Sequence, residues 1–86
     1  MILKWQLSNK EKAWKVIKQM NSKWVTSREL AYLAGIDTKQ MANFLKVAKK
    51  LGILEYKHET IRNSAGFRTT VGYWRKIRDF DIDEVL

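Results

Sequence analysis

The stretch Glu29-Leu30-Ala31-Tyr32-Leu33-Ala34-Gly35-Ile36-Asp37 decides the fold that the sequence predicts. It has the pattern of the end of one helix, a sharp turn at Gly35 and the cap of a second helix at Asp37. Glycine takes the left-handed conformation that closes a helix without a Cβ clash. Ala31, four residues earlier, is small enough to let two helices approach closely. This pattern is typical of a helix-turn-helix.

Capping signals place three helices around this turn. Ser8 with Glu11, and Thr26 with Glu29, have the spacing of capping boxes, and Asp37 with Gln40 repeats it. The expected helices cover residues 9–21, 27–34 and 38–51, and Gly52 ends the third. By the 3.6-residue period, the inward-facing residues are Ala13, Trp14, Ile17 and Met20 in the first helix, Leu30, Leu33 and Ala34 in the second, and Met41, Phe44, Leu45, Ala48 and Leu51 in the third.

After Gly52 the pattern changes to that of extended chain. In residues 53–60 apolar or aromatic side chains alternate with charged ones, and residues 67–77 are rich in Thr, Val, Tyr and Trp. The turn residues between them, 62–66, predict a β-hairpin. With a short extended piece at 24–26, the sequence predicts an α+β fold, with three helices and a small antiparallel sheet in the order α-β-α-α-β-β. We expect one domain over residues 1–86, with its core at 9–77.

The composition excludes several classes of function. There is no cysteine and a single histidine, His58, so disulfides, thiol nucleophiles and thiolate or histidine-rich metal sites are not expected. The spacing Asp79-x-Asp81-x-Asp83 resembles the start of a calcium loop but lacks the glycine and the distant glutamate of such a loop. No Gly-rich phosphate loop occurs. We therefore expect no enzymatic activity, no cofactor and no metal ion.

The sequence also indicates a compartment. The longest stretch without a charged or amide side chain is residues 30–36, which is too short for a membrane span. The N-terminus lacks the pattern of a secretory signal. We expect a cytoplasmic protein with no membrane partner, associated with the nucleoid, or in the host cytoplasm if the source is a virus.

Positive charge is unevenly distributed along the chain. There are 17 Lys and Arg against nine Asp and Glu, which gives a net charge of +8. Four of the nine acids lie in residues 79–86, so residues 1–78 carry 17 basic and five acidic groups, a net charge of +12. A basic body with a short acidic tail suggests a polyanionic partner for the body, although solubility alone is the alternative.

The third expected helix carries the decisive charge pattern. Lys39, Asn43, Lys46 and Lys50 are spaced four, three and four residues apart, so they form one stripe opposite the apolar face. No acid occurs in residues 38–50. The alternative is an ordinary solvated helix face, but such faces usually mix lysine with glutamate. A helix fits the major groove of DNA, where Asn43 can pair with adenine and the lysines can contact guanine or phosphate.

Two further segments support a nucleic-acid partner. A cationic hairpin tip over residues 60–69 can lie along the DNA backbone or enter the minor groove. The N-terminus of the second helix, at Ser27 and Arg28, can hold a phosphate. The complete set of candidate DNA-contacting residues is Ser27, Arg28, Thr38, Lys39, Gln40, Asn43, Lys46, Lys49, Lys50, Arg62, Asn63 and Arg68.

Over residues 9–77 the chain resembles the winged-helix branch of the helix-turn-helix proteins. The resemblance is carried by the segment 29–35, the helix 39–50, Lys49-Lys50-Leu51-Gly52-Ile53-Leu54 leading into the first hairpin strand, and Gly72-Tyr73-Trp74-Arg75 in the second. It implies that the third helix is a recognition helix, the hairpin a wing, and the protein a small transcriptional regulator like those of archaea, their viruses and plasmids. The chain lacks an effector-binding domain, so no small-molecule effector is expected.

The resemblance also implies a homodimer on two half-sites. Apolar residues at both ends of the chain, in 1–8 and 78–86, suggest segments that exchange between subunits, and the alternative is that both fold back onto the first helix of the same chain. The acidic tail can also dock on the basic face. Two further functions stay open: a winged-helix module that binds an acidic protein, and an architectural or replication-associated DNA binder with little sequence preference.

Overall fold

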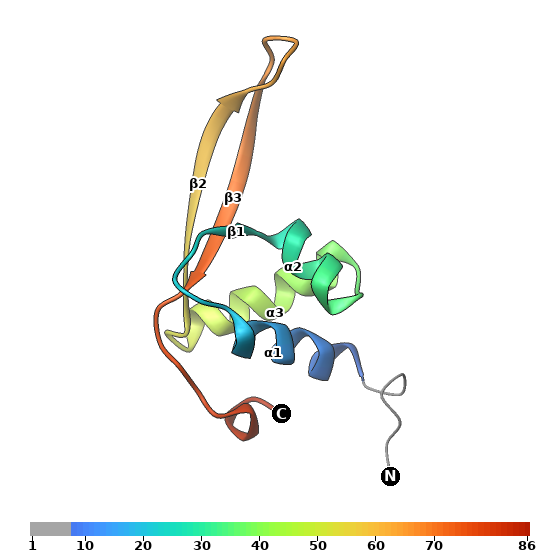
Figure 1. The fold of residues 1–86 in the computed structure, drawn as a ribbon, viewed down its shortest axis with the longest axis vertical. Coiled ribbons are helices and arrows are strands. Elements are labelled where there is room, and N and C mark those ends of the chain that lie inside the picture. The colour runs from blue at the N-terminus through green and yellow to red at the C-terminus, as the bar shows by residue number, and fades with distance from the viewer. Residues whose placement is uncertain (1–7) are drawn as a thin grey trace.

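The computed structural model describes residues 8–86, which form three helices packed against a three-stranded antiparallel sheet (Figure 1). The elements follow in the order α1 (Asn9–Gln19), β1 (Val25–Thr26), α2 (Ser27–Ala34), α3 (Thr38–Lys50), β2 (Leu54–Arg62), β3 (Arg68–Lys76) and a 3₁₀ turn, η2 (Ile82–Glu84). The α+β fold and its α-β-α-α-β-β order are those predicted, and the arrangement is that of a winged helix-turn-helix.

Side-chain caps begin all three helices. The backbone N–H of Glu11 donates to Ser8 Oγ (3.2 Å), that of Glu29 to Thr26 Oγ1 (3.2 Å), and that of Lys39 to the carboxylate of Asp37 (3.2 Å). These bonds satisfy N–H groups that have no partner within the helix. The caps predicted from the sequence are therefore confirmed as helix starts.

The turn between α2 and α3 has the predicted geometry. Gly35 has φ 71°, in the left-handed region, and its N–H donates to the carbonyl of Ala31 (2.9 Å). The N–H of Ile36 donates to the same carbonyl (3.1 Å). Ala31 is buried where α2 meets α3, so a larger side chain there would hold the helices apart.

The core lies between the three helices and the base of the sheet. Its largest fully buried side chains are Trp14, Ile17, Met41, Leu45, Ile53 and Leu54. Two predictions of inward-facing residues are wrong: Leu33 is 69% exposed and Leu51 is 48% exposed. Ala31 takes the buried place on α2 because α3 packs against that side of the helix, and Leu51 caps α3 beyond its last packed turn.

The sheet has the order β1-β3-β2, so β3 lies in the centre and β2 at an edge. Only Val25 and Thr26 pair with β3, opposite Trp74 and Tyr73, whereas β2 pairs with β3 along nine positions, from Leu54↔Lys76 to Arg62↔Arg68. Beyond Gly72 the hairpin is therefore a two-stranded ribbon, and it projects well past the helices (Figure 1). It gives the molecule its 52 Å length against widths of 26 and 17 Å.

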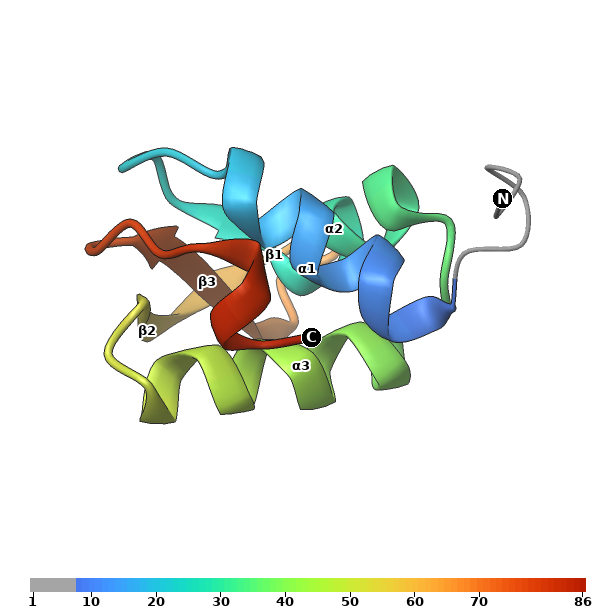
Figure 2. The ribbon, with the colours of Figure 1, turned by 90° about the horizontal axis from the view of Figure 1, so that it is seen from below.

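The C-terminal residues pack on the same chain. Phe80 is 4% exposed and meets the ring of Trp14 on α1 edge to face, with the centroids 5.7 Å apart. Ile82 and Val85 pack against the same core, and Figure 2 shows this segment running back beneath the helices. Residues 78–86 thus pack against the first helix of the same chain. The apolar residues of 1–7 lie outside the described residues.

The acidic tail does not dock on the front of α3. The carboxylate of Asp79 lies 3.0 Å from Lys18 Nζ and 2.9 Å from Lys76 Nζ. These two hydrogen-bonded ammonium groups, Lys76 first, hold the pKa of Asp79 well below its usual range. Glu84 lies 4.0 Å from Arg78. The tail is therefore held against α1 and the end of β3.

Candidate nucleic-acid interface

The residues that share the outer side of α3 form an exposed stripe. We call Lys39, Asn43, Lys46 and Lys50 the front stripe; all four are exposed, while Met41, Leu45 and Ala48 on the opposite side are fully buried. Among residues 8–86, no carboxylate lies within ion-pair distance of the front-stripe lysines or of Lys49. The stripe thus presents three cationic groups and one amide to solvent, with their charge uncompensated nearby.

The hairpin has two chemically different faces, which follow from its register. Residues directly opposite in an antiparallel pair point to the same side, and successive residues alternate. One face, which we call the inner face, carries Leu54, Tyr56, His58, Thr60 and Arg62. Their partners on β3 are, in the same order, Lys76, Trp74, Gly72, Thr70 and Arg68. The outer face carries Glu55, Lys57, Glu59 and Ile61. Their partners on β3 are, in the same order, Arg75, Tyr73, Val71 and Thr69. Both carboxylates of the hairpin are therefore on the outer face.

On the outer face these carboxylates are neutralised. Glu55 pairs with Arg75, its cross-strand partner, and Glu59 lies 3.0 Å from Lys57 Nζ. Lys57 and Arg75 both lie over the ring of Trp24, 4.6 Å from its centroid. The cations of this face thus have partners already. Those of the inner face at the tip, Arg62 and Arg68, have no carboxylate within ion-pair distance among residues 8–86.

A groove joins α3 to the inner face of the hairpin. It has a volume of about 380 Å³ and is lined by Ser27, Ala42, Lys46, Lys49, Tyr56, Gly72 and Trp74. Lys46 and Lys49 contribute its α3 wall, and Ser27 places the N-terminus of α2 at its edge. The groove thus connects α3 to the base of the inner face of the hairpin, and Lys46 and Lys49 are its cationic groups.

Tyr56 lies in this groove, and the sequence pattern did not single it out. Its ring is 4.6 Å from the ring of Trp74, and Lys49 Nζ lies 5.7 Å from its centroid. The ring crosses β3 at Gly72, where a Cβ atom would lie 2.4 Å from the tyrosine hydroxyl. Glycine is thus required here by close approach. Tyr56 is opposite Trp74 in the ladder and diagonal to Gly72, which is opposite His58, so only the strand alignment reveals this contact.

Not all of the predicted contact residues join this surface. Ser27, Lys46 and Lys49 line the groove, Lys39, Asn43 and Lys50 lie beside it on α3, and Arg62 and Arg68 lie at the far end of the inner face. Arg28 lies apart, in a hollow that it shares with Glu29, Tyr32 and Leu33.

Two of the remaining polar candidates make hydrogen bonds within the protein, and the third is exposed at the start of α3. Asn63 has its amide oxygen occupied, because it accepts from the N–H groups of Ala65 (3.0 Å) and Phe67 (3.1 Å) and so shapes the hairpin turn. Gln40 accepts from the side chain of Asn9 (2.6 Å), which ties α3 to α1. Thr38 is exposed at the first position of α3.

The comparisons with known proteins add no name to this surface. No protein-family model matches the sequence, and a search of the curated proteins found no similar chain. Among the helices of residues 8–86, none combines the length and the hydropathy that crossing a membrane requires.

Proposed function

We propose that this protein is a sequence-specific binder of double-stranded DNA that acts as a transcriptional regulator of the winged-helix type. In this proposal α3 enters the major groove, and the hairpin lies with its inner face along the backbone or in the minor groove. The single observation that carries it is the exposed front stripe, whose lysines have no carboxylate partner among residues 8–86.

The front stripe has the residue types for two kinds of contact. Asn43 can make a bidentate pair with an adenine edge, and Lys39 and Lys46 can donate to guanine. Lys49 and Lys50, nearer the C-terminal end of α3, serve as phosphate contacts, with Tyr56 beside Lys49 in the groove. Arg62 and Arg68 extend the phosphate-binding surface along the wing.

The faces of the hairpin support one orientation on DNA. The outer face carries two carboxylates in ion pairs, whereas the inner face carries none and continues the groove beside α3. Phosphate groups are repelled by carboxylates and attracted by uncompensated arginines. The inner face is thus the one that suits a DNA backbone.

The direct test is selection of bound duplexes from a random DNA pool, followed by affinity measurements on the selected site. We expect one recurrent sequence and a log–log salt slope of about −4 to −5 per subunit, from roughly four to six neutralised phosphates. Binding of all duplexes with equal affinity would support the architectural alternative. No binding at 100–200 mM salt (about physiological) would contradict DNA binding and leave the acidic-protein alternative.

A matched pair of lysine variants tests the surface itself. Lys46→Gln removes a charge from the groove and front stripe, and Lys57→Gln removes one from the outer face, where Lys57 already pairs with Glu59. We expect Lys46→Gln to weaken binding and to make the salt slope less steep by about 0.9. Lys57→Gln should leave both values near those of the wild type. Equal effects would mean that net charge alone drives binding.

A homodimer on two half-sites is part of the proposal. Regulators that dock a helix in each of two successive major grooves are two-fold symmetric, so the selected site should be palindromic, with half-site centres about 10 bp apart. Light scattering at micromolar concentration, with and without the selected duplex, measures the stoichiometry. One protein chain per duplex on a site without symmetry would contradict the dimer while leaving DNA binding intact.

A further inference from the structure

The turn at the tip of the hairpin presents a phenylalanine to solvent. Phe67 is 71% exposed, and the three residues before it, Ser64, Ala65 and Gly66, have small side chains or none. Within residues 8–86 its ring takes part in no aromatic pair and no cation–π contact. The ring is therefore the largest apolar group of the turn, and contact with a partner would remove it from water.

Asn63 braces the backbone that carries this ring. The N–H of Asn63 donates to the carbonyl of Phe67 (2.9 Å), and the amide oxygen of Asn63 accepts from the N–H groups of Ala65 (3.0 Å) and Phe67 (3.1 Å). The N–H of Gly66 donates to the carbonyl of Asn63 (2.9 Å). Both backbone polar groups of Phe67 are thus bonded to one residue, so the ring is positioned before any partner arrives.

Two arginines flank the turn. Arg62 and Arg68 form the last pair of the β2–β3 ladder, and no carboxylate of residues 8–86 lies within ion-pair distance of either. An apolar side chain between cations is the combination with which proteins open the minor groove of DNA. The cations contact the backbone and the groove, and the apolar side chain enters between base pairs.

The length of the ribbon suits this role. Four residue pairs, from Glu59↔Val71 to Arg62↔Arg68, lie beyond Gly72, and Figure 1 shows this part of the hairpin projecting past the helices. At about 3.4 Å per residue, the four pairs extend about 14 Å before the turn begins. The neighbouring minor groove lies half a helical turn, about 17 Å, from the major groove. With α3 in the major groove, the turn is therefore long enough to reach it.

We propose that Phe67 inserts between two base pairs from the minor groove and bends the bound duplex. The inference rests on the proposed function and adds to it recognition through DNA deformability. Unstacking a base step costs least at flexible pyrimidine–purine steps. The protein therefore prefers such a step about 5 bp, or half a helical turn, from the base pair that Asn43 contacts.

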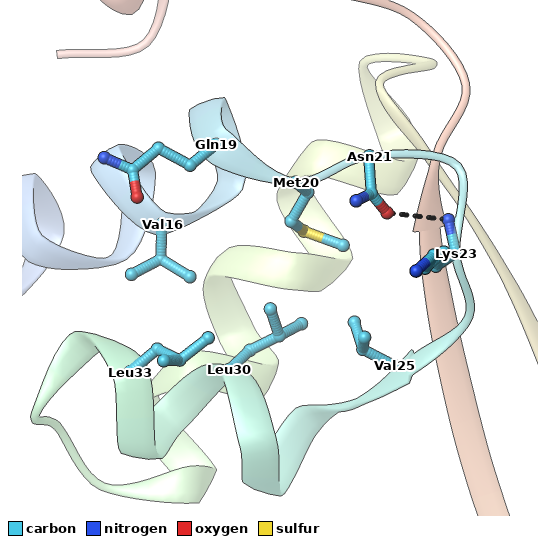
Figure 3. Close-up of a pocket in the computed structure, with 8 residues that line it drawn as sticks. All are labelled: Val16, Gln19, Met20, Asn21, Lys23, Val25, Leu30 and Leu33. Atoms are coloured by element: carbon cyan, nitrogen blue, oxygen red, sulfur yellow. Dashed lines mark hydrogen bonds between the residues drawn. The ribbon is translucent and has the colours of Figure 1, made fainter.

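Leu33 provides a matched control for Phe67. It is 69% exposed, close to the value for Phe67, but it lies beside a pocket of about 280 Å³ that Val16, Met20 and Leu30 also line (Figure 3). The residues of this pocket are distinct from those of the groove beside α3 and from the front stripe. Phe67→Ala and Leu33→Ala thus both remove an exposed apolar side chain, one at the tip and one away from the proposed DNA surface.

Two fluorescence measurements on the selected duplex test the insertion. Energy transfer between dyes at the two ends measures the bend, and 2-aminopurine at the pyrimidine–purine step measures unstacking. For the wild type and Leu33→Ala we expect a bend of roughly 20–90° and an emission rise of at least about twofold. Phe67→Ala should bind the same site with less than about half of this bend and no rise in emission. Its melting temperature should match that of the wild type, because the side chain is exposed.

The outcomes separate this inference from DNA binding itself. A duplex that stays straight with the wild type, or that bends equally with Phe67→Ala, would overturn the insertion and leave sequence-specific binding intact. Equal losses with Phe67→Ala and Leu33→Ala would also overturn it, because the effect would not come from the tip. Failure to bind any duplex would contradict both proposals.

A second selection from the random DNA pool, now with Phe67→Ala, tests the predicted preference for a flexible step. We expect the variant to keep the base preference at the position contacted by Asn43 and to lose the preference for a pyrimidine–purine step half a turn away. Recovery of the same step with Phe67→Ala would show that the ring does not select it, and would overturn the inference.

Discussion

Arg62 and Arg68 are directly opposite each other in the last pair of the β2–β3 ladder, on the inner face of the hairpin. Like charges in such a pair repel one another. Among residues 8–86 neither guanidinium has a carboxylate within ion-pair distance. The hairpin therefore ends in a pair of cations whose repulsion a bound anion would relieve.

Arg68→Thr tests the effect of this pair on both stability and DNA affinity. Threonine favours strands and removes the repulsion, so we expect the free energy of unfolding to stay the same or rise by about 0.2–1 kcal/mol at low salt. DNA affinity should fall, with a salt slope less steep by about 0.9. Chemical denaturation and binding titrations measure the two effects. Loss of stability would show that the arginine pair supports the free protein.

Asn43→Ala tests base recognition. Asn43 lies exposed in the middle of the front stripe, so its removal should leave the fold intact. We expect a loss of about 1–3 kcal/mol on the selected site and relaxed preference at one base position. The control is Gln19→Ala, an exposed amide on α1, which should not change affinity. A uniform loss over all duplexes would mean that Asn43 does not read bases.

Gly72→Ala tests the contact between Tyr56 and β3. The added Cβ would lie 2.4 Å from the tyrosine hydroxyl, so the ring must leave its place beside Trp74. We expect a cost of about 1–3 kcal/mol in the free energy of unfolding and a change in tryptophan emission. In a Tyr56→Ala background the same substitution should cost little. An equal cost in both backgrounds would place the strain in the backbone and not in the ring.

Asp79→Asn has an effect that depends on pH. The ammonium groups of Lys76 and Lys18 depress the pKa of Asp79 in the folded protein, so its stabilising effect is full above the pKa of the unfolded chain, about 3.9, and is lost as pH falls toward the lower, folded value. We expect the wild type to melt at a higher temperature than the variant at pH 7, and the difference to shrink below about pH 4. A difference independent of pH would contradict this.

Much of the fold could be predicted because its signals are local. Ser8, Thr26 and Asp37 cap helices through bonds to residues two or three positions away. The turn that ends α2 depends only on the left-handed conformation of Gly35. The exposure of Leu33 could not be predicted in this way. A helical period tells which side chains share a face, but which face α3 covers depends on packing between elements distant in sequence.

The front stripe could also be predicted, because it lies on a single helix. The groove could not, since it depends on strand register, which brings the ring of Tyr56 against Gly72. That Glu55 and Glu59 share one face follows from the alternation along β2 alone. Gln40 shows the same limit. Its spacing from Asp37 predicts a capping role, but its side chain accepts from Asn9, 31 residues away.

The hydrogen bonds of Asp79 to Lys18 and Lys76 hold four acidic residues beside α1, at the opposite end of the long axis from the arginines of the hairpin tip (Figure 1). The carboxylates of the tail are thus far from the hairpin tip, and a polyanion that approaches Arg62 and Arg68 is not repelled by them. Electrostatic attraction at the tip should therefore speed association at low salt, and this gain should disappear as the salt concentration rises.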